Sequence, residues 1–190
     1  TPAEGTVLVN GTPIEKQKNY CGYMPQQDML FPWRTVKENV MLPMEIQGSI
    51  SKAEMEERAE QALESVGLKD WGKKSPRELS GGQQKRLCIA RALATRPQYI
   101  IFDESFSGLD VTLKKEILGF LKELHKELQI GFLIITHDLD TAMYMEGAIH
   151  VMRRGKIIET VEQPHHFSDF QEPYSQMLVK AVRSKRLALQ

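Results

Sequence analysis

Four places in the sequence carry side chains that could bind a phosphorylated ligand or assist its hydrolysis. The first, Leu79-Ser80-Gly81-Gly82-Gln83, places a hydroxyl and two glycines at the predicted start of a helix. Glycine lets backbone N–H groups approach a ligand closely, and a helix N-terminus favours negative charge, so this turn could bind a phosphate. Taken alone, Ser80 is explained better as a helix N-cap, and only the neighbouring motifs favour phosphate binding.

The second segment places two adjacent carboxylates after a short apolar run. Asp103 and Glu104 follow Tyr99-Ile100-Ile101-Phe102, which is typical of a buried parallel strand. The two carboxylates would then stand at the carboxyl edge of a sheet, where α/β folds bind their ligands. One could hold Mg²⁺ while the other orients a water molecule. The alternative is that Asp103 caps the strand and Glu104 is an ordinary solvated charge.

Gln26 and His137 complete the set of candidate polar side chains. Gln26 leaves the apolar run Cys21–Pro25 and enters a loop with aromatic residues. His137 follows the apolar run 132–135, which predicts that its imidazole stands at the same sheet edge as the carboxylates. Considered singly, Gln26 would be a surface loop residue and His137 a satisfied structural histidine.

The elements that must position these residues alternate between strands and helices. Asn10-Gly11 is a strong hairpin turn signal after the β-prone residues 6–9. The strand, helix, strand order of residues 99–103, 113–124 and 132–135 indicates a right-handed βαβ crossover, and therefore an α/β fold with a parallel sheet. A further helix is predicted to begin near Thr35, and another runs from the capping box Ser51-x-x-Glu54 to a cap at Gly67. Two more helices are predicted over residues 80–95 and 173–183. A hairpin is predicted to turn at residues 153–155.

Composition excludes several other classes of protein. The 190 residues carry 41% hydrophobic and 26% charged residues with zero net charge, which fits a globular protein without a global field for nucleic acid or anionic lipid. The longest apolar runs are too short for a membrane span. Cys21 and Cys88 lack metal or disulfide spacing, as expected of reduced thiols in the cytosol. The first residue is Thr1 and no signal peptide follows, which we interpret as a cut chain.

In their order, these motifs resemble those of the nucleotide-binding subunit of ABC transporters. The spacing of 54 residues between Gln26 and Ser80 is similar to the compact helical subdomain of transporter ATPases, not to the long coiled coil of chromosome-maintenance ATPases. The resemblance implies an α/β fold with a P-loop NTPase-like parallel sheet core and an inserted helical subdomain. The matches to the Q-loop, signature motif, Walker B strand, D-loop and H-loop are, in order, Gln26, Ser80-Gly81-Gly82-Gln83, Asp103-Glu104, Ser107-Gly108-Leu109-Asp110 and His137.

The resemblance also implies a role for each matched residue, with ATP and Mg²⁺ as the bound groups. Glu104 would polarise the attacking water and His137 would touch the γ-phosphate, while Asp103 and Gln26 would lie around Mg²⁺. Asp110 would lie at a dimer seam. The residues that would contact the γ-phosphate of ATP bound to the opposite subunit are Ser80, Gly81, Gly82 and Gln83. One site would therefore need two chains.

One motif of the family is not found in the sequence. No strand, loop and helix with the phosphate-binding pattern G-x-x-x-x-G-K-[ST] is present. The nearest match, residues 67–74, has Lys74 where a hydroxyl should bind Mg²⁺, and it follows a helix. We expect the N-terminal part with the phosphate loop to be missing, because the family places it before the segment that residues 1–14 resemble. The isolated chain should then leave apolar sheet surface uncovered and hydrolyse no ATP.

The resemblance implies the ATP-binding subunit of an ABC-type importer. Residues 31–36 resemble the ATPases of nitrate, sulfonate and taurine importers, whereas residues 172–175 resemble peptide and nickel importers. The implied partners are a second ATPase subunit in a homodimer or heterodimer, transmembrane permease subunits and an extracytoplasmic solute-binding protein, with no nucleic acid. The implied location is cytoplasmic, on the inner face of the cell membrane.

Two other functions stay open from the sequence alone. A soluble ABC ATPase that acts on ribosomes or DNA would show tandem cassettes or a long insertion, and neither is visible. A catalytically dead fragment could serve as an interaction module. His165-His166 is expected to belong to a solvated linker rather than a metal site. We expect four parts in the chain. Residues 1–30 form a β region with the start of the Q-loop, and residues 31–94 form a helical subdomain with the signature motif. Residues 95–163 form an α/β catalytic core, and residues 164–190 form a helical tail.

Overall fold

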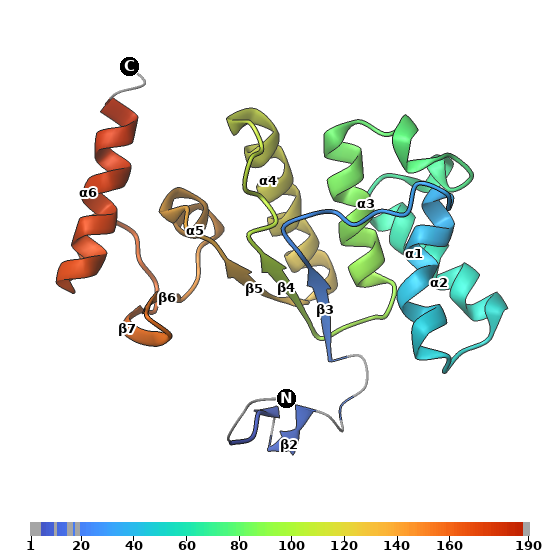
Figure 1. Ribbon diagram of the computed structural model, residues 1–190, viewed down its shortest axis with the longest axis horizontal. Coiled ribbons are helices and arrows are strands. Elements are labelled where there is room, and N and C mark those ends of the chain that lie inside the picture. The colour runs from blue at the N-terminus through green and yellow to red at the C-terminus, as the bar shows by residue number, and fades with distance from the viewer. Residues whose placement is uncertain (1–4, 10, 15–16, 18–19, 188–190) are drawn as a thin grey trace. The chain divides into compact units, whose positions relative to one another are not determined.

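The computed structural model describes residues 5–9, 11–14, 17 and 20–187. Contacts between Cα atoms divide the chain into two compact units, Thr1–Ile135 and Thr136–Gln190, and each is considered by itself. The first unit holds a parallel sheet with helices (Figure 1), which confirms the predicted α/β class.

The first unit is built on a three-stranded parallel sheet in the order β3 (Cys21–Met24), β4 (Tyr99–Asp103) and β5 (Gly131–Ile135). In this register Met24 pairs with Phe102, and Asp103 pairs with Ile135. The predicted strand over residues 99–103 is confirmed at both ends. The carboxyl ends of neighbouring strands therefore lie at one edge, as the placement of the candidate residues requires.

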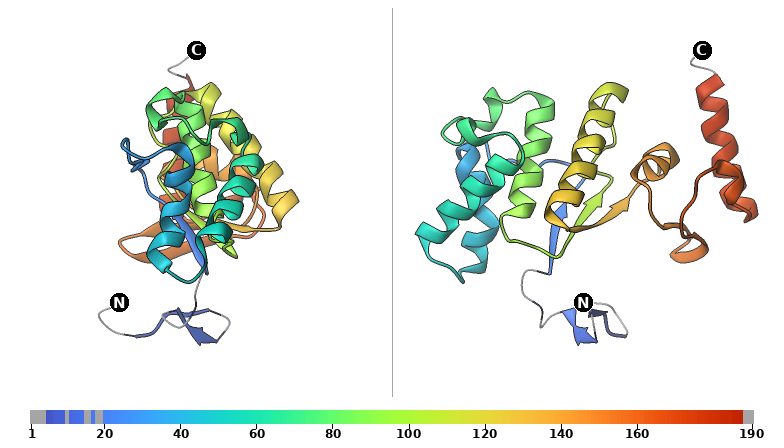
Figure 2. Two further views of the ribbon diagram at one scale, coloured as in Figure 1. Left: turned by 90° about the vertical axis from the view of Figure 1, so that its right-hand side faces the viewer. Right: turned by 180° about the vertical axis from the view of Figure 1, so that it is seen from behind.

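Helices cover one face of this sheet. Gly22 lies so close to α3 (Gly81–Leu93) that an added Cβ would meet the Ala92 carbonyl oxygen at 2.9 Å. Ile100 and Phe102 on the same face are buried. The connection from β4 to β5 is α4 (Val111–Leu128), which runs alongside the strands in Figure 2. On the opposite face the exposed side chains include Tyr23, Leu133 and Ile135, which agrees with the uncovered apolar surface expected from the sequence.

Between β3 and α3 the chain forms a helical region, as predicted. Thr35 caps α1 (Val36–Gln47) through a capping box with Glu38, and α1 packs against α2 (Lys52–Ser65) and α3. Ser51 caps α2, but the Glu54 carboxylate pairs with Arg58, so only half of the predicted capping box forms. The predicted cap at Gly67 is confirmed by its φ of 72°. Two 3₁₀ turns, η2 (Lys69–Trp71) and η3 (Pro76–Glu78), lead to α3.

The N-terminal segment forms the predicted hairpin. β1 (Leu8–Val9) pairs antiparallel with β2 (Thr12–Pro13), and Gly11 has a φ of 76° that suits a tight turn. The first residue of the turn signal, Asn10, lies outside the described residues.

The second unit is a helix, a hairpin and a longer helix. These elements are α5 (Leu139–Met145), β6 (Ile149–Arg153), β7 (Lys156–Val161), η4 (Phe167–Asp169) and α6 (Pro173–Leu187). Its core is the buried cluster of Val151, Phe170 and Val179. The hairpin turns at Arg154-Gly155 as predicted, whereas α6 runs beyond the predicted end at residue 183. Among the described helices, none has the length and apolar character to cross a bilayer.

The two adjacent histidines of this unit are part of a local turn. The backbone N–H groups of His165 and His166 both donate to Asp169 Oδ2, each at 2.8 Å. These bonds hold the pKa of the Asp169 carboxyl below its ordinary value. Over the part of the chain that the structure describes, no cluster of three or more His, Cys, Asp or Glu residues could hold a metal ion.

Candidate functional site

The two adjacent carboxylates lie at the carboxyl end of β4, where the sequence placed them. Asp103 is the last residue of the strand, and Glu104 follows in the left-handed region with a φ of 48°. Glu104 N–H donates to the Ile135 carbonyl at 2.9 Å, and its carbonyl accepts from Ser107 N–H at 3.0 Å. A non-glycine residue with positive φ costs backbone energy and tends to occur where function fixes a side chain. The backbone thus holds Glu104 in a defined position at this edge.

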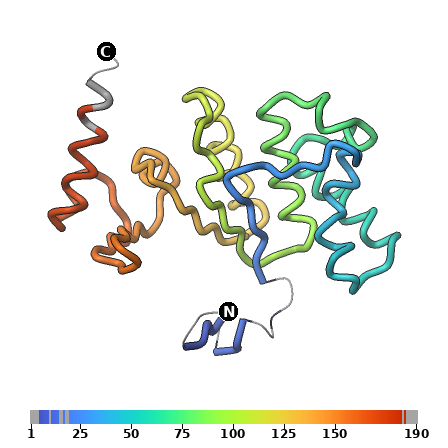
Figure 3. The backbone as a smooth tube through the Cα atoms, in the orientation of Figure 1, coloured from blue at the N-terminus to red at the C-terminus, as the bar shows by residue number. Residues whose placement is uncertain are grey.

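The Q-loop glutamine lies beside the segment that follows these carboxylates. The chain leaves β3 and runs through residues 25–35 to α1 (Figure 3). Gln26 Nε2 donates to Ser107 Oγ at 3.2 Å, and Ser107 Oγ donates to the Glu104 carbonyl at 2.8 Å. The buried Ser105 hydroxyl donates to the Met24 carbonyl at 2.6 Å, which ties the same two segments together. The structure therefore brings Gln26 and the two carboxylates into one place, the carboxylate edge (Gln26, Asp103 and Glu104).

A tyrosine that sequence reasoning did not assign to the site also contacts it. Tyr23 OH donates to Asp103 Oδ2 at 2.8 Å. This hydrogen bond, then desolvation and the negative charge of Asp103, raise the pKa of Tyr23 above its ordinary value of 10.0. Strand register could have revealed the contact, because Tyr23 pairs with Ile101, which lies on the same face as Asp103.

Asp103→Asn is expected to lower the pKa of Tyr23 toward 10.0, because the substitution removes the hydrogen bond to a carboxylate and, with it, the negative charge. The bond to the carboxylate is fully formed below the ordinary phenol pKa and is lost as the pH rises through the raised value. NMR titration of the Tyr23 ring carbon measures the change. Asp70→Asn, on the exposed turn η2, should leave the titration unchanged. An unaltered Tyr23 pKa in Asp103→Asn would contradict the contact.

The signature residues form the N-terminus of α3, and the alternative assignment of Ser80 as an N-cap is confirmed. Ser80 Oγ accepts from Gln83 N–H at 3.3 Å, and Gln83 Oε1 accepts from Ser80 N–H at 2.9 Å. The two glycines differ in their surroundings. An added Cβ at Gly82 would meet Leu113 Cδ1 at 2.9 Å, whereas one at Gly81 would meet nothing within 4 Å. Gly82 therefore packs closely against Leu113 of α4, whereas the space beside Gly81 is open.

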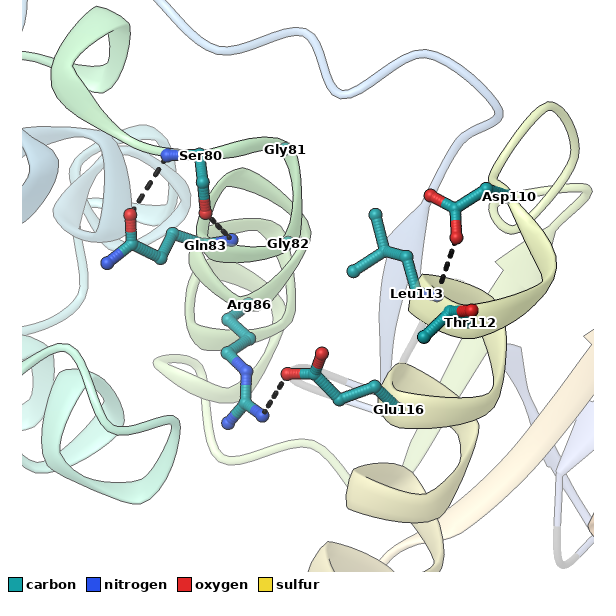
Figure 4. A pocket seen from close by; sticks show the side chains of 9 residues that line it. All are labelled: Ser80, Gly81, Gly82, Gln83, Arg86, Asp110, Thr112, Leu113 and Glu116. Carbon is teal, nitrogen blue, oxygen red and sulfur yellow. Dashed lines mark hydrogen bonds and ion pairs between the residues drawn. The ribbon is translucent and has the colours of Figure 1, made fainter.

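A pocket of about 440 Å³ separates the N-termini of α3 and α4 (Figure 4). Asp110 caps α4 by accepting from Leu113 N–H at 2.9 Å, and Arg86 and Glu116 form an ion pair at 3.2 Å across the pocket. The structure brings Asp110 and the signature residues to one pocket, and their predicted place at a dimer seam stays a prediction. Of the described residues, those that line this signature pocket are Ser80, Gly81, Gly82, Gln83, Arg86, Asp110, Thr112, Leu113 and Glu116.

The carboxylate edge and the signature pocket are different places in the first unit. None of the three residues of the carboxylate edge is among the described residues that line the pocket. His137 belongs to the second unit, so its role beside the carboxylates stays a prediction. The chain thus presents two polar surfaces, one with acidic groups at a sheet edge and one with a helix N-terminus that favours anions.

The carboxylate edge has donors that fit Mg²⁺ bound together with a nucleotide. Magnesium is usually held by one or two carboxylates and by substrate phosphates, with water completing the shell. Asp103 supplies a carboxylate, and Gln26 supplies an amide oxygen because its Nε2 is directed to Ser107. Because phosphate and water supply the other ligands, Mg²⁺ bound in this way does not require a cluster of three His, Cys, Asp or Glu side chains.

Known proteins are similar in sequence to this chain over most of its length. Residues 1–107 match the sequence model of the family described as ABC transporter. The methionine import ATP-binding protein MetN of Corynebacterium glutamicum is 37% identical over 187 residues, which cover 94% of this chain and 52% of MetN. The spermidine/putrescine import ATP-binding protein PotA of Vibrio cholerae is 38% identical over 83% of this chain and 42% of PotA. The chain spans about half the length of these curated relatives.

A solved structure has the same architecture. It is the dimeric post-hydrolysis state of the ATP-binding cassette MJ0796 bound to ADP and Pi, with a TM-score of 0.67 and 30% sequence identity. The match covers 87% of this chain and 76% of the cassette. The fold is therefore the α/β fold of P-loop NTPases in its ABC form. With the motif order, the family match and this architecture in agreement, the chain belongs to the ABC transporter family, as one of its ATP-binding domains.

Proposed function

We propose that this chain is the ATP-binding and ATP-hydrolysing domain of an ABC importer, and that it works as a dimer with shared ATP sites. The observation that carries the proposal is the separation between the carboxylate edge and the signature pocket. Each surface has some of the groups that bind a nucleoside triphosphate, and with a phosphate loop supplied, two chains arranged head to tail would complete two sites. The dimeric state of the cassette MJ0796 with ADP and Pi supports this arrangement.

At the carboxylate edge, the chain's part in hydrolysis is to position and polarise water. Glu104 accepts a hydrogen bond from the attacking water and increases its nucleophilicity, while its backbone conformation fixes the direction of the carboxylate. Asp103 and Gln26 hold Mg²⁺, which neutralises phosphate charge when bound. His137, from the second unit, is the donor to the γ-phosphate that the family resemblance implies. Together these groups act mainly by positioning and electrostatic stabilisation.

At the signature pocket, the chain offers donors to the ATP of the other subunit. Ser80 Oγ accepts a hydrogen bond from Gln83 N–H, and its hydroxyl proton is donated to a phosphate oxygen. Gly81 leaves its backbone N–H open to the same phosphate, and the dipole of α3 favours the negative charge. Asp110 lies at the rim of this pocket and would face the dimer seam.

The importer assignment implies membrane partners on the helical region. Trp33, whose side chain is 76% exposed, stands in the loop before α1, and Met29 and Ile46 are also exposed. The buried Asn39 amide fixes this loop: its Oδ1 accepts from Phe31 N–H at 2.8 Å and its Nδ2 donates to the Phe31 carbonyl at 3.1 Å. We assign the loop with the exposed Trp33 to contact with a permease subunit; the domain would then lie on the cytoplasmic face of the membrane, with a solute-binding protein on the other side.

The proposed solute class comes from the loop before α1. Residues 31–36 favour an importer of nitrate, sulfonate or taurine type. The relatives described above are named as importers of methionine and of spermidine or putrescine. The proposed parts of the domain are those predicted from the sequence, with residues 31–94 as the helical subdomain between the strands of the core.

The proposed function predicts ATP-dependent dimerisation. Because the 190 residues contain no phosphate-loop pattern, the test uses a fusion protein in which the corresponding segment of MetN precedes Thr1. With Mg²⁺ and ATP it should sediment as a dimer and release phosphate. The same protein with the phosphate-loop lysine replaced by alanine should stay monomeric and inactive. A fusion protein that binds ATP as a monomer and never dimerises would contradict the shared site.

A further inference from the structure

Three side chains of α3 hold the segment that follows the Q-loop glutamine. Lys85 Nζ contacts Asp28 Oδ1 at 2.6 Å, and the two side chains are only 8% and 24% exposed. Arg91 donates to the Asp28 carbonyl at 2.7 Å and to the Met29 carbonyl at 2.8 Å. Cys88 Sγ lies 3.5 Å from the Asp28 carbonyl oxygen. Lys85, Cys88 and Arg91 form what we call the α3 clamp, and their spacing of three residues places them along one side of the helix.

The α3 clamp connects the two halves of the proposed site within one chain. Asp28 lies two residues after Gln26, which bonds to Ser107 beside the carboxylates. At its other end, the same helix begins with the signature residue Gly81. Because α3 is one continuous helix from Gly81 to Leu93, it forms a rigid connection between the segment at Asp28 and the signature turn.

We propose that Lys85 is a positioning residue: its ion pair with Asp28 locks the Q-loop to the signature helix, so that the carboxylate edge and the signature pocket of one chain move together. Given the proposed function, Gln26 responds to the ATP of its own chain, whereas Ser80 and Gly81 contact the ATP of the partner. Occupancy of one site would therefore change the geometry of the other, and the coupling would act equally in both directions.

Burial explains why Lys85 can have this role. A buried ammonium group is strongly unfavourable without a partner, so the helix and the loop gain more from staying in contact than an exposed ion pair would give. Arg91 fixes carbonyl groups of the loop, and Lys85 adds the contact to the Asp28 side chain. Met29 adopts a φ of 45°, which costs backbone energy and shows that the loop is held away from its relaxed conformation.

Cys88 provides a native reporter of the clamp. Burial raises the pKa of the Cys88 thiol to about 12, with the Asp28 charge as a smaller cause and the Arg91 and Lys85 charges opposing it, so burial within the intact clamp keeps the thiol unreactive. In a Cys21→Ser background, Lys85→Met is expected to increase the rate of Cys88 modification by a disulfide reagent by about tenfold or more. Lys69→Met removes an exposed ion pair with Glu64 and should leave the rate unchanged.

A second readout separates positioning from simple stabilisation. Spin labels at Gln27→Cys and Gly81→Cys, with Cys21→Ser and Cys88→Ala, report the distance between the Q-loop and the signature turn. The parent should give one narrow distance distribution, and Lys85→Met a broad one at temperatures well below its own unfolding midpoint. If Lys85→Met does not fold, Lys85→Met/Asp28→Asn replaces it, because this pair of substitutions leaves no unpaired buried charge.

The outcomes distinguish this inference from the proposed function, because neither readout uses ATP. Faster Cys88 modification with a broad distance distribution supports the lock, whether or not the fusion protein dimerises. A lowered unfolding midpoint with an unchanged distance distribution would reduce Lys85 to a structural residue and overturn the proposal. An equal increase in Cys88 modification in Lys69→Met would overturn it as well.

Discussion

Glu104→Gln is expected to lower ATP hydrolysis by the fusion protein by more than about a hundredfold, since general base catalysis by a positioned carboxylate contributes this much. An amide of the same shape cannot accept a proton from the water or polarise it to the same degree. Binding should survive, because the signature pocket and the other groups of the carboxylate edge are untouched. The variant should therefore accumulate as an ATP-bound dimer, measured by sedimentation and by single-turnover phosphate release.

Glu127→Gln is the matched control for this prediction. Glu127 is an exposed carboxylate on α4, outside both proposed half-sites, so its substitution removes the same charge without touching the reaction. Turnover should stay at the level of the parent. If Glu104→Gln also kept the turnover of the parent, the carboxylate that follows β4 would not be the group that polarises water.

Gly81→Ala is expected to reduce hydrolysis on the order of a hundredfold while leaving the isolated chain as stable as before. An added methyl group meets nothing within 4 Å in this chain, so packing is unaffected. In the dimer the methyl group would stand where the partner's phosphate approaches the backbone N–H. ATP-dependent dimerisation should weaken together with hydrolysis, and thermal unfolding of the unfused chain should show no change.

Substitutions at two other glycines are the controls for Gly81→Ala. Gly72→Ala places its Cβ 3.6 Å from Lys37 in ordinary contact and lies outside both half-sites, so activity and stability should both persist. Gly82→Ala brings its Cβ to 2.9 Å from Leu113 Cδ1 and should disturb the contact between α3 and α4. A lowered unfolding midpoint in Gly81→Ala would mean that Gly81 has a packing role like that of Gly82.

Local patterns in the sequence predicted most of the elements of the first unit. Residues 99–102 are an apolar run that ends at the acidic residue Asp103. They form a strand with these bounds because the sheet neighbours on both sides exclude water from its centre. Ser80 and Thr35 begin helices because their side chains accept from backbone N–H groups of the first turn. These signals act over a few residues, so they can be found without tertiary structure.

The contacts that complete the site join residues far apart in the chain. Tyr23 and Asp103 are separated by 80 positions, and Asp28 and Lys85 by 57. Their pairing follows from strand order and from the packing of α3, which no local pattern specifies. At Glu54 a local pattern predicted a contact that does not form. The sequence predicted a capping box there, but Arg58, one turn along the helix, pairs with the carboxylate instead.

The shared site is tested most directly by mixing two inactive copies of the fusion protein, Glu104→Gln and Gly81→Ala. In a mixed dimer both substitutions fall in the same site, and the other site combines an intact carboxylate edge with an intact signature turn. Mixing is expected to restore hydrolysis, up to about a quarter of the parent rate for random pairing into symmetric two-site dimers. A mixture as inactive as either copy alone, under conditions where mixed dimers form, would place the whole site within one chain and contradict the account.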